Sequence, residues 1–362
     1  MQIIADRRAL HRIPEPDFRL PKTIAYIKNA LSGLNCRVIT PIETAVCAWF
    51  DFGAPRSIAF RADMDALPIT EQTGLPFSSE HPGYMHACGH DGHMAIALEL
   101  ARYLSRQETF PNNVLVVFQP AEETIGGAKP LCESGIFQQL RIEAVFGLHL
   151  WPSLEAGVLH TRIGFLMSRV SEVTVDILGR PAHIGKAWEA IDALAAGMEF
   201  YRKARAFEQG LDPSVQRILN FGKMQSGTVR NIISGHTRLE GSLRAYSDEV
   251  FDYLREQLLT IGKEVEAQFG CTVELCFSEG YPAVNNDPAL VEKLHGFMDF
   301  RELEAPTMIS EDFSYYQKLL PGVFFFLGVG DTPSLHNDGF CFDEEVLMKG
   351  AEFFMQLARD YR

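Results

Sequence analysis

Short apolar runs alternate along the first part of the chain with segments in which apolar residues recur every three or four positions. Runs such as 45–50 and 114–118 have the length and composition of buried strands, whereas the apolar spacing over 92–104 is typical of an amphipathic helix. Strands interleaved with helices predict an α/β fold, in which helices flank a central sheet. The predicted elements are strands at 36–40, 45–50, 57–62, 114–118 and 144–150, and helices at 23–34 and 92–104.

The pattern changes in the middle of the chain. Residues 171–178 alternate apolar and polar side chains, which is typical of a sheet with one face exposed to solvent. The elements from there onward follow the order β-α-β-β-α-β of a ferredoxin-like α+β unit. We therefore predict an inserted second domain over 167–278. Its predicted strands are 171–178, 217–224, 236–245 and 271–277, and its predicted helices are 190–209 and 248–269.

After the insertion the chain returns to the first type of pattern. A helix is predicted at 288–298, a buried strand at 323–329 and a closing helix at 343–361. A chain of 362 residues, 46% of them apolar, is longer than one typical domain and can bury two cores. The first domain is therefore predicted to combine 1–166 with 279–362, around a mixed central sheet.

The charge balance argues against two classes of partner. Lys and Arg total 33 and Asp and Glu total 47, which gives a net charge of −14 at pH 7. Because such a protein attracts neither nucleic acid nor an anionic membrane surface, we expect no partner of either kind. We also expect no signal peptide after Met1, and no apolar run approaches the roughly 20 residues that span a bilayer. The seven cysteines form no even disulfide framework, which favours the cytoplasm.

Residues 86–93, His-Ala-Cys-Gly-His-Asp-Gly-His, concentrate possible metal ligands just before a predicted helix. Cys88 and His90 stand at the turn, and glycine at position 89 lets the backbone bend so that both side chains face one centre. A thiolate there is stabilised by a cation and by the N-terminus of the helix. The alternative interpretation is a buried cysteine beside a histidine that caps the helix.

Further polar residues stand at the ends of predicted core strands. These residues are Asp63 and Asp65, Glu122 and Glu123, and His149. In open α/β sheets, ligands bind outside the carboxyl ends of the strands, so we expect these side chains to converge in one cleft. On its own, His149 would equally fit a histidine that is buried in the core with its hydrogen bonds satisfied.

The adjacent acids Glu122 and Glu123 can play two different roles in catalysis. One carboxylate can bind a metal ion, which lowers the pKa of its bound water from 15.7 toward about 7. The other can take the proton from that water and later return it to a leaving amine. Either glutamate can play either part, and a solvated acidic turn is the alternative interpretation.

Among the other histidines, His336 is notable because it lies in a loop after the strand predicted at 323–329. Read alone, it resembles a surface histidine. The histidines to which no role is assigned are His11, His81, His160, His236 and His295.

Taken together, the order of several short motifs resembles that of the M20 metallopeptidase family. The match is to its amidohydrolase branch, which includes N-acyl-amino-acid deacylases, hippurate hydrolases, indole-acetyl-amino-acid hydrolases and N-acetyldiaminopimelate deacetylases. The resemblance covers nearly the whole chain, from 8–14 onward. Its motifs are 63–68 (Asp-Met-Asp-Ala-Leu-Pro), 85–91, 118–123 (Phe-Gln-Pro-Ala-Glu-Glu), 147–149, 227–232, 310–313 (Ser-Glu-Asp-Phe) and 335–337.

The resemblance implies a zinc-peptidase-like catalytic domain that holds two divalent metal ions per subunit. It implies that Cys88 lies between the two ions. The softness of thiolate and imidazole favours Zn²⁺, while the carboxylate and water positions also admit Mn²⁺, Co²⁺ or Ni²⁺. The implied ligands are Cys88, His90, Glu123, His149 and His336.

The resemblance also implies roles outside the metal ligands. Glu122 matches the catalytic base, and Asp63 matches an acid that orients a ligand, a role for which Asp65 is the weaker candidate. In the family the inserted domain, a lid, forms a homodimer and lends a histidine to the site; His183 matches it and would stabilise the oxyanion. Asn231 and Arg244 match positions that hold the carbonyl or carboxylate of the substrate.

The chain departs from the family pattern around His183. Many relatives carry a second histidine shortly after it, whereas this chain has Trp188, and Pro181 now precedes His183. The departure leaves the implied ligands untouched and concerns substrate preference. A large aromatic side chain there would favour an apolar acyl group or pack the lid.

We therefore expect a dinuclear metal-dependent amidohydrolase that cleaves N-acyl amino acids into a carboxylate and a free amino acid. An N-acetyldiaminopimelate substrate is one candidate among several, which include hippurate and other N-acyl amino acids. A dipeptidase or aminopeptidase of the wider family is the alternative, and the Cys-Gly-His pattern argues against it. A non-catalytic ligand-binding protein on the same scaffold is the alternative of another class.

Overall fold

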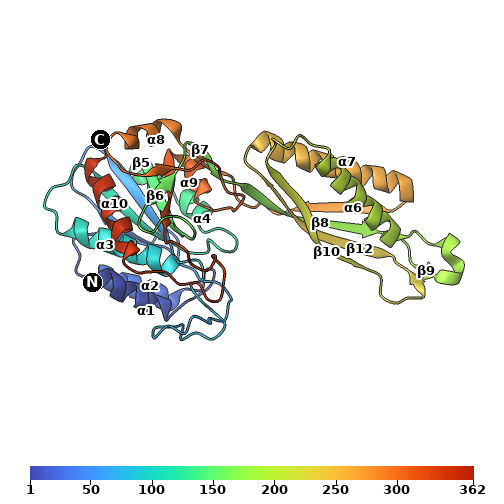
Figure 1. Cartoon of the computed structure of the whole chain (residues 1–362), viewed down its shortest axis with the longest axis horizontal. Helices are drawn as coiled ribbons and strands as arrows, with labels where there is room; N and C mark the ends of the chain where they lie inside the picture. The colour runs from blue at the N-terminus through green and yellow to red at the C-terminus, as the bar shows by residue number, and fades with distance from the viewer. The chain divides into compact units, whose positions relative to one another are not determined.

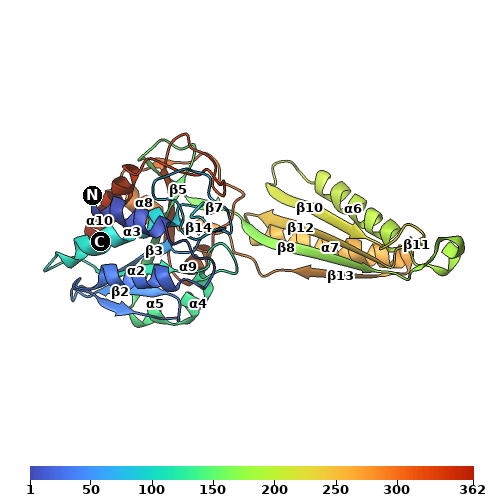
Figure 2. The same cartoon turned by 90° about the horizontal axis from the view of Figure 1, so that it is seen from below.

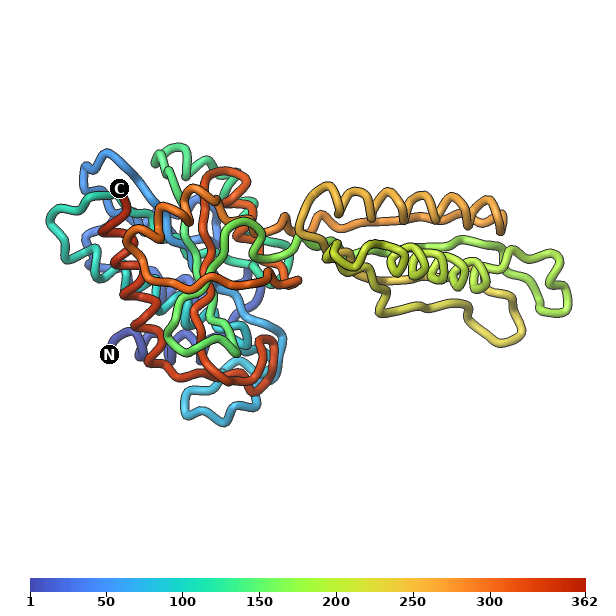
Figure 3. The backbone as a smooth tube through the Cα atoms, turned by 45° about the horizontal axis from the view of Figure 1, so that its top comes forward, coloured from blue at the N-terminus to red at the C-terminus, as the bar shows by residue number.

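The computed structural model describes residues 1–362, which fold as two compact units. Both chain termini lie in the first of them (Figure 3). Unit 1 comprises Met1–Leu166, Val284–Pro306 and Glu311–Arg362, and unit 2 comprises Met167–Ala283 and Thr307–Ser310.

Unit 2 differs at its margins from the insertion predicted at 167–278. The backbone N–H of Val170 donates to the carbonyl oxygen of Tyr281 at 3.1 Å, which adds the segment after residue 278 to this unit. The hydroxyl of Ser168 donates to the carbonyl oxygen of Met308 at 2.9 Å, which adds a short segment from much later in the chain. These long-range contacts to backbone carbonyl groups carry no local sequence signal.

Unit 1 is built on a mixed sheet of eight strands (Figure 1). In spatial order the strands are β1 (Arg37–Ile39), β2 (Val46–Phe50), β4 (Asn113–Gln119), β3 (Ser57–Asp63), β5 (Ile142–Trp151), β16 (Gly322–Gly328), β6 (Leu159–Thr161) and β15 (Arg301–Glu302). The central strands β4, β3, β5 and β16 run parallel to one another. Their carboxyl ends therefore meet at one edge of the sheet.

Helices cover both faces of this sheet, and the alternation of side chains along β16 shows how. Val323, Phe325 and Leu327 belong to the main core, which several helices complete. Phe324 points to the opposite face, where its ring lies 4.8 Å from that of Phe313. The helices of unit 1 are α1 (Gln2–His11), α2 (Pro21–Leu31), α3 (His90–Ser105), α4 (Ala128–Glu133), α5 (Ile136–Gln139), α8 (Pro288–His295), α9 (Ser314–Leu319) and α10 (Val346–Asp360).

Unit 2 contains an antiparallel sheet of four strands with two long helices packed against it (Figure 2). The element order β8-α6-β10-β12-α7-β13 and the strand order β10-β12-β8-β13 are those of a ferredoxin-like fold. The elements are β8 (Arg169–Leu178), α6 (Ala193–Gln209), β10 (Arg217–Ser226), β12 (His236–Ala245), α7 (Asp248–Phe269) and β13 (Thr272–Phe277). A small two-stranded antiparallel sheet pairs β9 (Ala182–His183) with β11 (Ile232–Ile233).

The predicted fold class is confirmed, and the strongly periodic elements lie where the sequence places them. Strand β12 and helix α7 match their predicted bounds residue for residue. Helix α6 begins at Ala193 instead of 190, because the carboxylate of Asp192 caps it by accepting from the N–H groups of Leu194 and Ala195.

Helix α1 was not predicted, because its buried face carries charged residues as well as apolar ones. Arg7 and His11 are buried, and both contact the carboxylate oxygen Oδ2 of Asp91 at 2.9 Å. His11 Nε2 lies 3.2 Å from Glu71. Burial alone would lower the pKa of His11, but the neighbouring Asp91 carboxylate and the bond to Glu71 raise it to about 9.

Replacing His11 with Asn should change how stability depends on pH. A pKa raised from 6.5 to about 9 contributes stability that is complete below pH 6.5 and is lost as the pH rises through 9. At 1.36 kcal/mol per pKa unit the contribution is about 3 kcal/mol. Denaturant unfolding at pH 6 and pH 10 should show this loss in the wild type and not in the His11→Asn variant. The exposed residue His295, changed to Asn, is the control; an unchanged pH slope in His11→Asn would contradict the assignment.

Candidate metal centre

Cys88 and His90 flank the glycine at which helix α3 begins. Gly89 caps this helix with φ +84°, a left-handed conformation that glycine adopts without strain. A Cβ at this position would also approach Cδ1 of Leu150 to 3.1 Å. The turn leaves Cys88 Sγ and a ring nitrogen of His90 within 4.8 Å of each other, and both residues are buried. The thiol thus lies near the positive end of a 16-residue helix.

Backbone carbonyl groups orient two of the imidazole rings. Nδ1 of His90 lies 2.8 Å from the carbonyl oxygen of Asp65, and Nδ1 of His149 lies 2.7 Å from that of Leu150. Because a carbonyl only accepts, each Nδ1 carries a proton and each Nε2 is left to face the centre. Nε2 of His149 is 3.4 Å from Cys88 Sγ. Cys88, His90 and His149 form a buried group whose ligand atoms lie within 4.8 Å of one another.

A second group of three shares the same thiol. Cys88, Glu123 and His336 also place their ligand atoms within 4.8 Å of one another. His336 Nε2 lies 3.3 Å from Glu123 Oε1. His336 has φ +63°, which is strained for a residue other than glycine, and its N–H donates to the carbonyl oxygen of Ala87 at 2.9 Å. That bond ties the loop to the residue before Cys88.

The turn that carries Glu122 and Glu123 is held by Asp65. The two oxygens of this buried carboxylate accept from the backbone N–H groups of Glu122 and Glu123, at 2.9 and 3.0 Å. Ala121 just before them has φ +57° and is fully buried. Asp65 thus fixes a strained turn and, through its carbonyl group, the ring of His90. The sequence had ranked this residue below Asp63 for such a role.

Asp63 lies between His93, which is outside the implied ligand set, and His90, which belongs to it. Its Oδ1 lies 2.6 Å from Nδ1 of His93 and 3.7 Å from Nδ1 of His90. Its Oδ2 accepts from the buried guanidinium of Arg61 at 2.7 Å. Asp63 therefore contacts His93 directly. The sequence assigned His93 no role, although it stands three residues after His90 in the same motif.

The charges around the centre favour an added cation. Burial raises the pKa of the Cys88 thiol well above its usual value, and the carboxylates of Glu123 and Glu122 raise it further. Burial and neighbouring carboxylates likewise raise the pKa of Glu122. Burial lowers the pKa of His90, but the carboxylates of Asp63, Asp65 and Glu123 together outweigh it and the value rises to about 10. These three shifts favour a proton or a metal ion at Cys88, Glu122 and His90, whereas burial and the neighbouring His93 lower the pKa of His149 well below its usual value and favour its neutral ring.

One donor atom also lacks a partner that a bound cation would supply. Nε2 of His90 is buried without a hydrogen-bond partner and lies 3.7 Å from Oε1 of Glu123, which in turn lies 3.3 Å from Nε2 of His336. A buried polar atom without a partner is costly, and a cation beside His90 would satisfy it. Two groups of thiolate, imidazole and carboxylate donors with a shared sulfur fit two divalent transition-metal ions.

The predicted residues of unit 2 do not all lie together. His183 and Asn231 are neighbours, because His183 pairs with Ile232 and the carbonyl oxygen of Asn231 accepts from the N–H of residue 184. Arg244 instead pairs with Val170, at the start of β8. Strand β9 follows the far end of β8, which lies about 26 Å from Val170 at 3.3 Å per residue. One small substrate therefore cannot touch Arg244 and His183 of the same unit.

Unit 2 also contains the residue that departs from the family pattern. Trp188 lies in a short 3₁₀ segment, 184–189, directly after His183, and its side chain is 78% exposed. Arg244 is half-buried, and its guanidinium donates to the carbonyl oxygen of Met308 at 2.6 Å. No helix has the length and apolar character that crossing a membrane requires.

A shared thiol, three imidazoles and two adjacent carboxylates define the class of a metal-dependent hydrolase. The chain belongs to the family described as Peptidase family M20/M25/M40, whose model matches residues 59–360. Within this family it is a metal-dependent amidohydrolase, a class that the full-length relatives share.

Among those relatives, a Limosilactobacillus fermentum protein is 35% identical over 97% of this chain and 95% of its own length. A Shouchella clausii protein is 36% identical over 95% and 94%. Both are named N-acetyldiaminopimelate deacetylase.

Solved structures also match nearly the whole chain. A protein from methicillin-resistant Staphylococcus aureus is 31% identical, with a TM-score of 0.93 over 99% of this chain and 96% of its own. A Bacillus subtilis protein, described as a dinuclear metal-binding peptidase of the M20 family, is 30% identical, with a TM-score of 0.85 over 99% and 96%. The mixed sheet and the ferredoxin-like unit are thus those of the family.

Changing Asp65 to Asn should disable the turn while preserving the fold. Asn keeps one acceptor oxygen but turns an N–H₂ group toward the N–H of Glu122 or Glu123. A displacement of about 1 Å at a reacting group costs up to about 10²-fold in rate. We therefore expect turnover of an N-acetyl amino acid to fall at least about tenfold. The control is Asp51→Asn, an exposed carboxylate that also accepts from a backbone N–H. Wild-type turnover in Asp65→Asn would exclude the positioning role.

Proposed function

We propose that this protein hydrolyses the amide bond of N-acyl amino acids and releases a carboxylate and a free amino acid. The observation that carries the proposal is the pair of three-donor groups that share Cys88, with the Glu122 carboxylate beside them. The names of the full-length relatives make an N-acetylated substrate, and N-acetyldiaminopimelate in particular, the first candidate.

The proposed ligands of two divalent ions are Cys88, His90, Glu123, His149 and His336. Zn²⁺ suits the thiolate and imidazole donors, and Mn²⁺ suits the carboxylate, with Co²⁺ and Ni²⁺ as further candidates. When bound, the ions would act as Lewis acids on the substrate carbonyl and lower the pKa of water.

Glu122 is the proposed base. Its amide is fixed by Asp65, so its side chain leaves the turn beside His90 and Glu123. Glu122 would take a proton from the attacking water at a carboxylate oxygen, hold it, and donate it to the departing nitrogen. Glu123, the next residue, would bind metal, because its Oε1 faces both His90 and His336.

His183 is the proposed donor to the oxyanion. Its Nδ1 accepts from the N–H of Gly185 at 3.1 Å, so the proton resides on Nε2 of this exposed ring. Nε2–H is therefore ready to donate to developing negative charge. Arg244 and Asn231 are proposed to hold the carboxylate and carbonyl of the substrate. Since Arg244 lies at the other end of the sheet from His183 and Asn231, the latter two would come from a second subunit.

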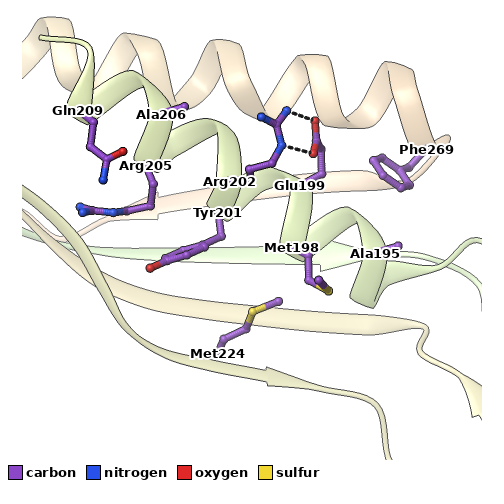
Figure 4. Close-up of a pocket in the computed structure, with 10 residues that line it drawn as sticks. All are labelled: Ala195, Met198, Glu199, Tyr201, Arg202, Arg205, Ala206, Gln209, Met224 and Phe269. Carbon is purple, nitrogen blue, oxygen red and sulfur yellow. Dashed lines mark hydrogen bonds and ion pairs between the residues drawn. The ribbon is translucent and has the colours of Figure 1, made fainter.

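A second copy of the chain is the proposed partner, bound through unit 2. Strand β10 is an edge strand, and such strands pair readily with their own copies. Next to it, helix α6 exposes Met198 and Tyr201 beside Met224 of β10 (Figure 4). These side chains border a hollow of about 740 Å³. An isologous dimer would cover this apolar surface and supply each site with the β9–β11 sheet of the other subunit.

Replacing Glu122 with Gln should abolish turnover without removing metal. A positioned acid–base group contributes about 10²- to 10⁴-fold, so kcat should fall by that factor. Metal content is measured on the same sample, and N-acetyl amino acids are assayed beside dipeptides to separate deacylase from dipeptidase activity. Glu133→Gln on α4 is the control. Full turnover with metal bound would remove Glu122 from its role, and loss of metal would make it a ligand.

Replacing Met198 with Glu should convert the dimer into monomers. The charge would be buried against its own copy, which costs several kcal/mol without a partner. Light scattering should show a halved mass, and activity should fall with it because His183 would no longer reach a second site. Val38→Glu, at an exposed apolar position of unit 1, is the matched control. An active monomer would contradict both the dimer and the role of His183.

A further inference from the structure

His93 is a buried histidine, and both of its ring nitrogens make hydrogen bonds within the site. Nδ1 lies 2.6 Å from Oδ1 of Asp63, and Nε2 accepts from the backbone N–H of Leu150 at 2.9 Å. Since an amide N–H only donates, Nε2 carries the lone pair and Nδ1 carries the proton. Asp63, His90 and His93 lie close enough together to suggest a metal site, but a proton occupies the bond between Asp63 and His93.

The second partner of His93 is the residue that orients His149. Leu150 donates its N–H to His93, and its carbonyl oxygen accepts from Nδ1 of His149 at 2.7 Å. The rings of His93 and His149 also touch edge to face, with centroids 4.5 Å apart and planes at 67°. Any shift of His93 would therefore move the backbone of Leu150 and remove a ring contact of His149. These two contacts together direct His149 Nε2 toward Cys88.

The other partner of His93, Asp63, is held by a buried cluster of charged side chains. Asp63 Oδ2 accepts from Nη1 of Arg61 at 2.7 Å, and Nη2 of the same guanidinium donates to Glu311 and Asp312 at 2.9 and 2.8 Å. All four of these side chains are buried to 98% or more. His93 thus connects the buried Arg61–Asp63–Glu311–Asp312 cluster to the backbone at the end of β5.

We propose that His93 is a positioning residue that sets the direction of His149 and so holds the Cys88–His90–His149 half of the metal centre. The inference rests on the proposed two-ion site. Partners of this kind are worth about 10- to 100-fold in metal affinity. His93 acts through Leu150 and His149 and touches neither ion nor substrate.

Two variants separate the two bonds of His93. In His93→Asn the amide nitrogen replaces Nδ1 and still donates to Asp63, but nothing accepts from Leu150. In His93→Gln the amide oxygen replaces Nε2 and still accepts from Leu150, while the bond to Asp63 is lost. Calorimetric titration of the metal-free protein with Zn²⁺ counts the ions, and the absorption spectrum of the Co²⁺ form reports their geometry.

We expect His93→Asn to bind one of the two ions about 10- to 100-fold more weakly and to show an altered Co²⁺ spectrum. His149→Ala, which removes the ligand itself, should weaken the same ion, whereas His336→Ala should weaken the other. His93→Gln should restore the binding to within about threefold of the wild type, since it preserves the bond to Leu150.

Two results would overturn the inference. One is wild-type binding of both ions by His93→Asn; the other is equal weakening by Asn and Gln, which would reflect a general loss of packing. Unfolding midpoints of the metal-free variants show whether each is folded. If the wild type itself failed to bind two ions, the proposed function would fail instead, so the two failures are distinguishable.

Discussion

Acidic side chains buried at the carboxyl edge of the unit 1 sheet set the constraint on which the rest of the structure depends. Carboxylates cannot remain charged in a water-free interior without positive charge nearby. On one side the guanidinium of Arg61 contacts Asp63, Glu311 and Asp312 at distances of 2.7 to 2.9 Å, and burial raises the pKa of Glu311 to about 8, so that Glu311 keeps a proton at neutral pH. On the other side the proposed ions would supply positive charge to the thiol and to Glu123. Asp63 stands where these two regions meet.

Hydrogen bonds with backbone groups fix most of the side-chain orientations around these buried acids. Carbonyl oxygens of residues 65 and 150 orient two imidazole rings, and the amides of the glutamate pair are held by one carboxylate. Positive φ angles at Ala121 and His336 cost of order 1–3 kcal/mol each. Such strain persists because surrounding hydrogen bonds over-determine both turns. The side chains determine which atoms can bind a metal ion, and hydrogen bonds with the backbone determine how those side chains are oriented.

The sequence predicts the architecture well because period-2 and period-3.6 patterns report directly on burial. Ligand candidates were found because they stand at strand ends or in motifs. Helix α1 was missed because its buried face contains Arg7 and His11, which apolar periodicity does not register. His93 and Asp65 were undervalued for a related reason: their partners are backbone groups and residues far along the chain, and no local pattern records such contacts. Residue types predict which atoms can bind a metal, but only folding decides which atoms point inward.

The positions of the donors along the chain bear on how the protein acquires its metal during synthesis. Cys88, His90 and His149 all precede the inserted unit, whereas His336 follows it. Strand β16, which pairs with the strand that carries His149, and the Glu311 and Asp312 partners of Arg61 also follow the inserted unit. The first group of donors is therefore synthesised early, but the structure that holds it depends on segments that are synthesised last.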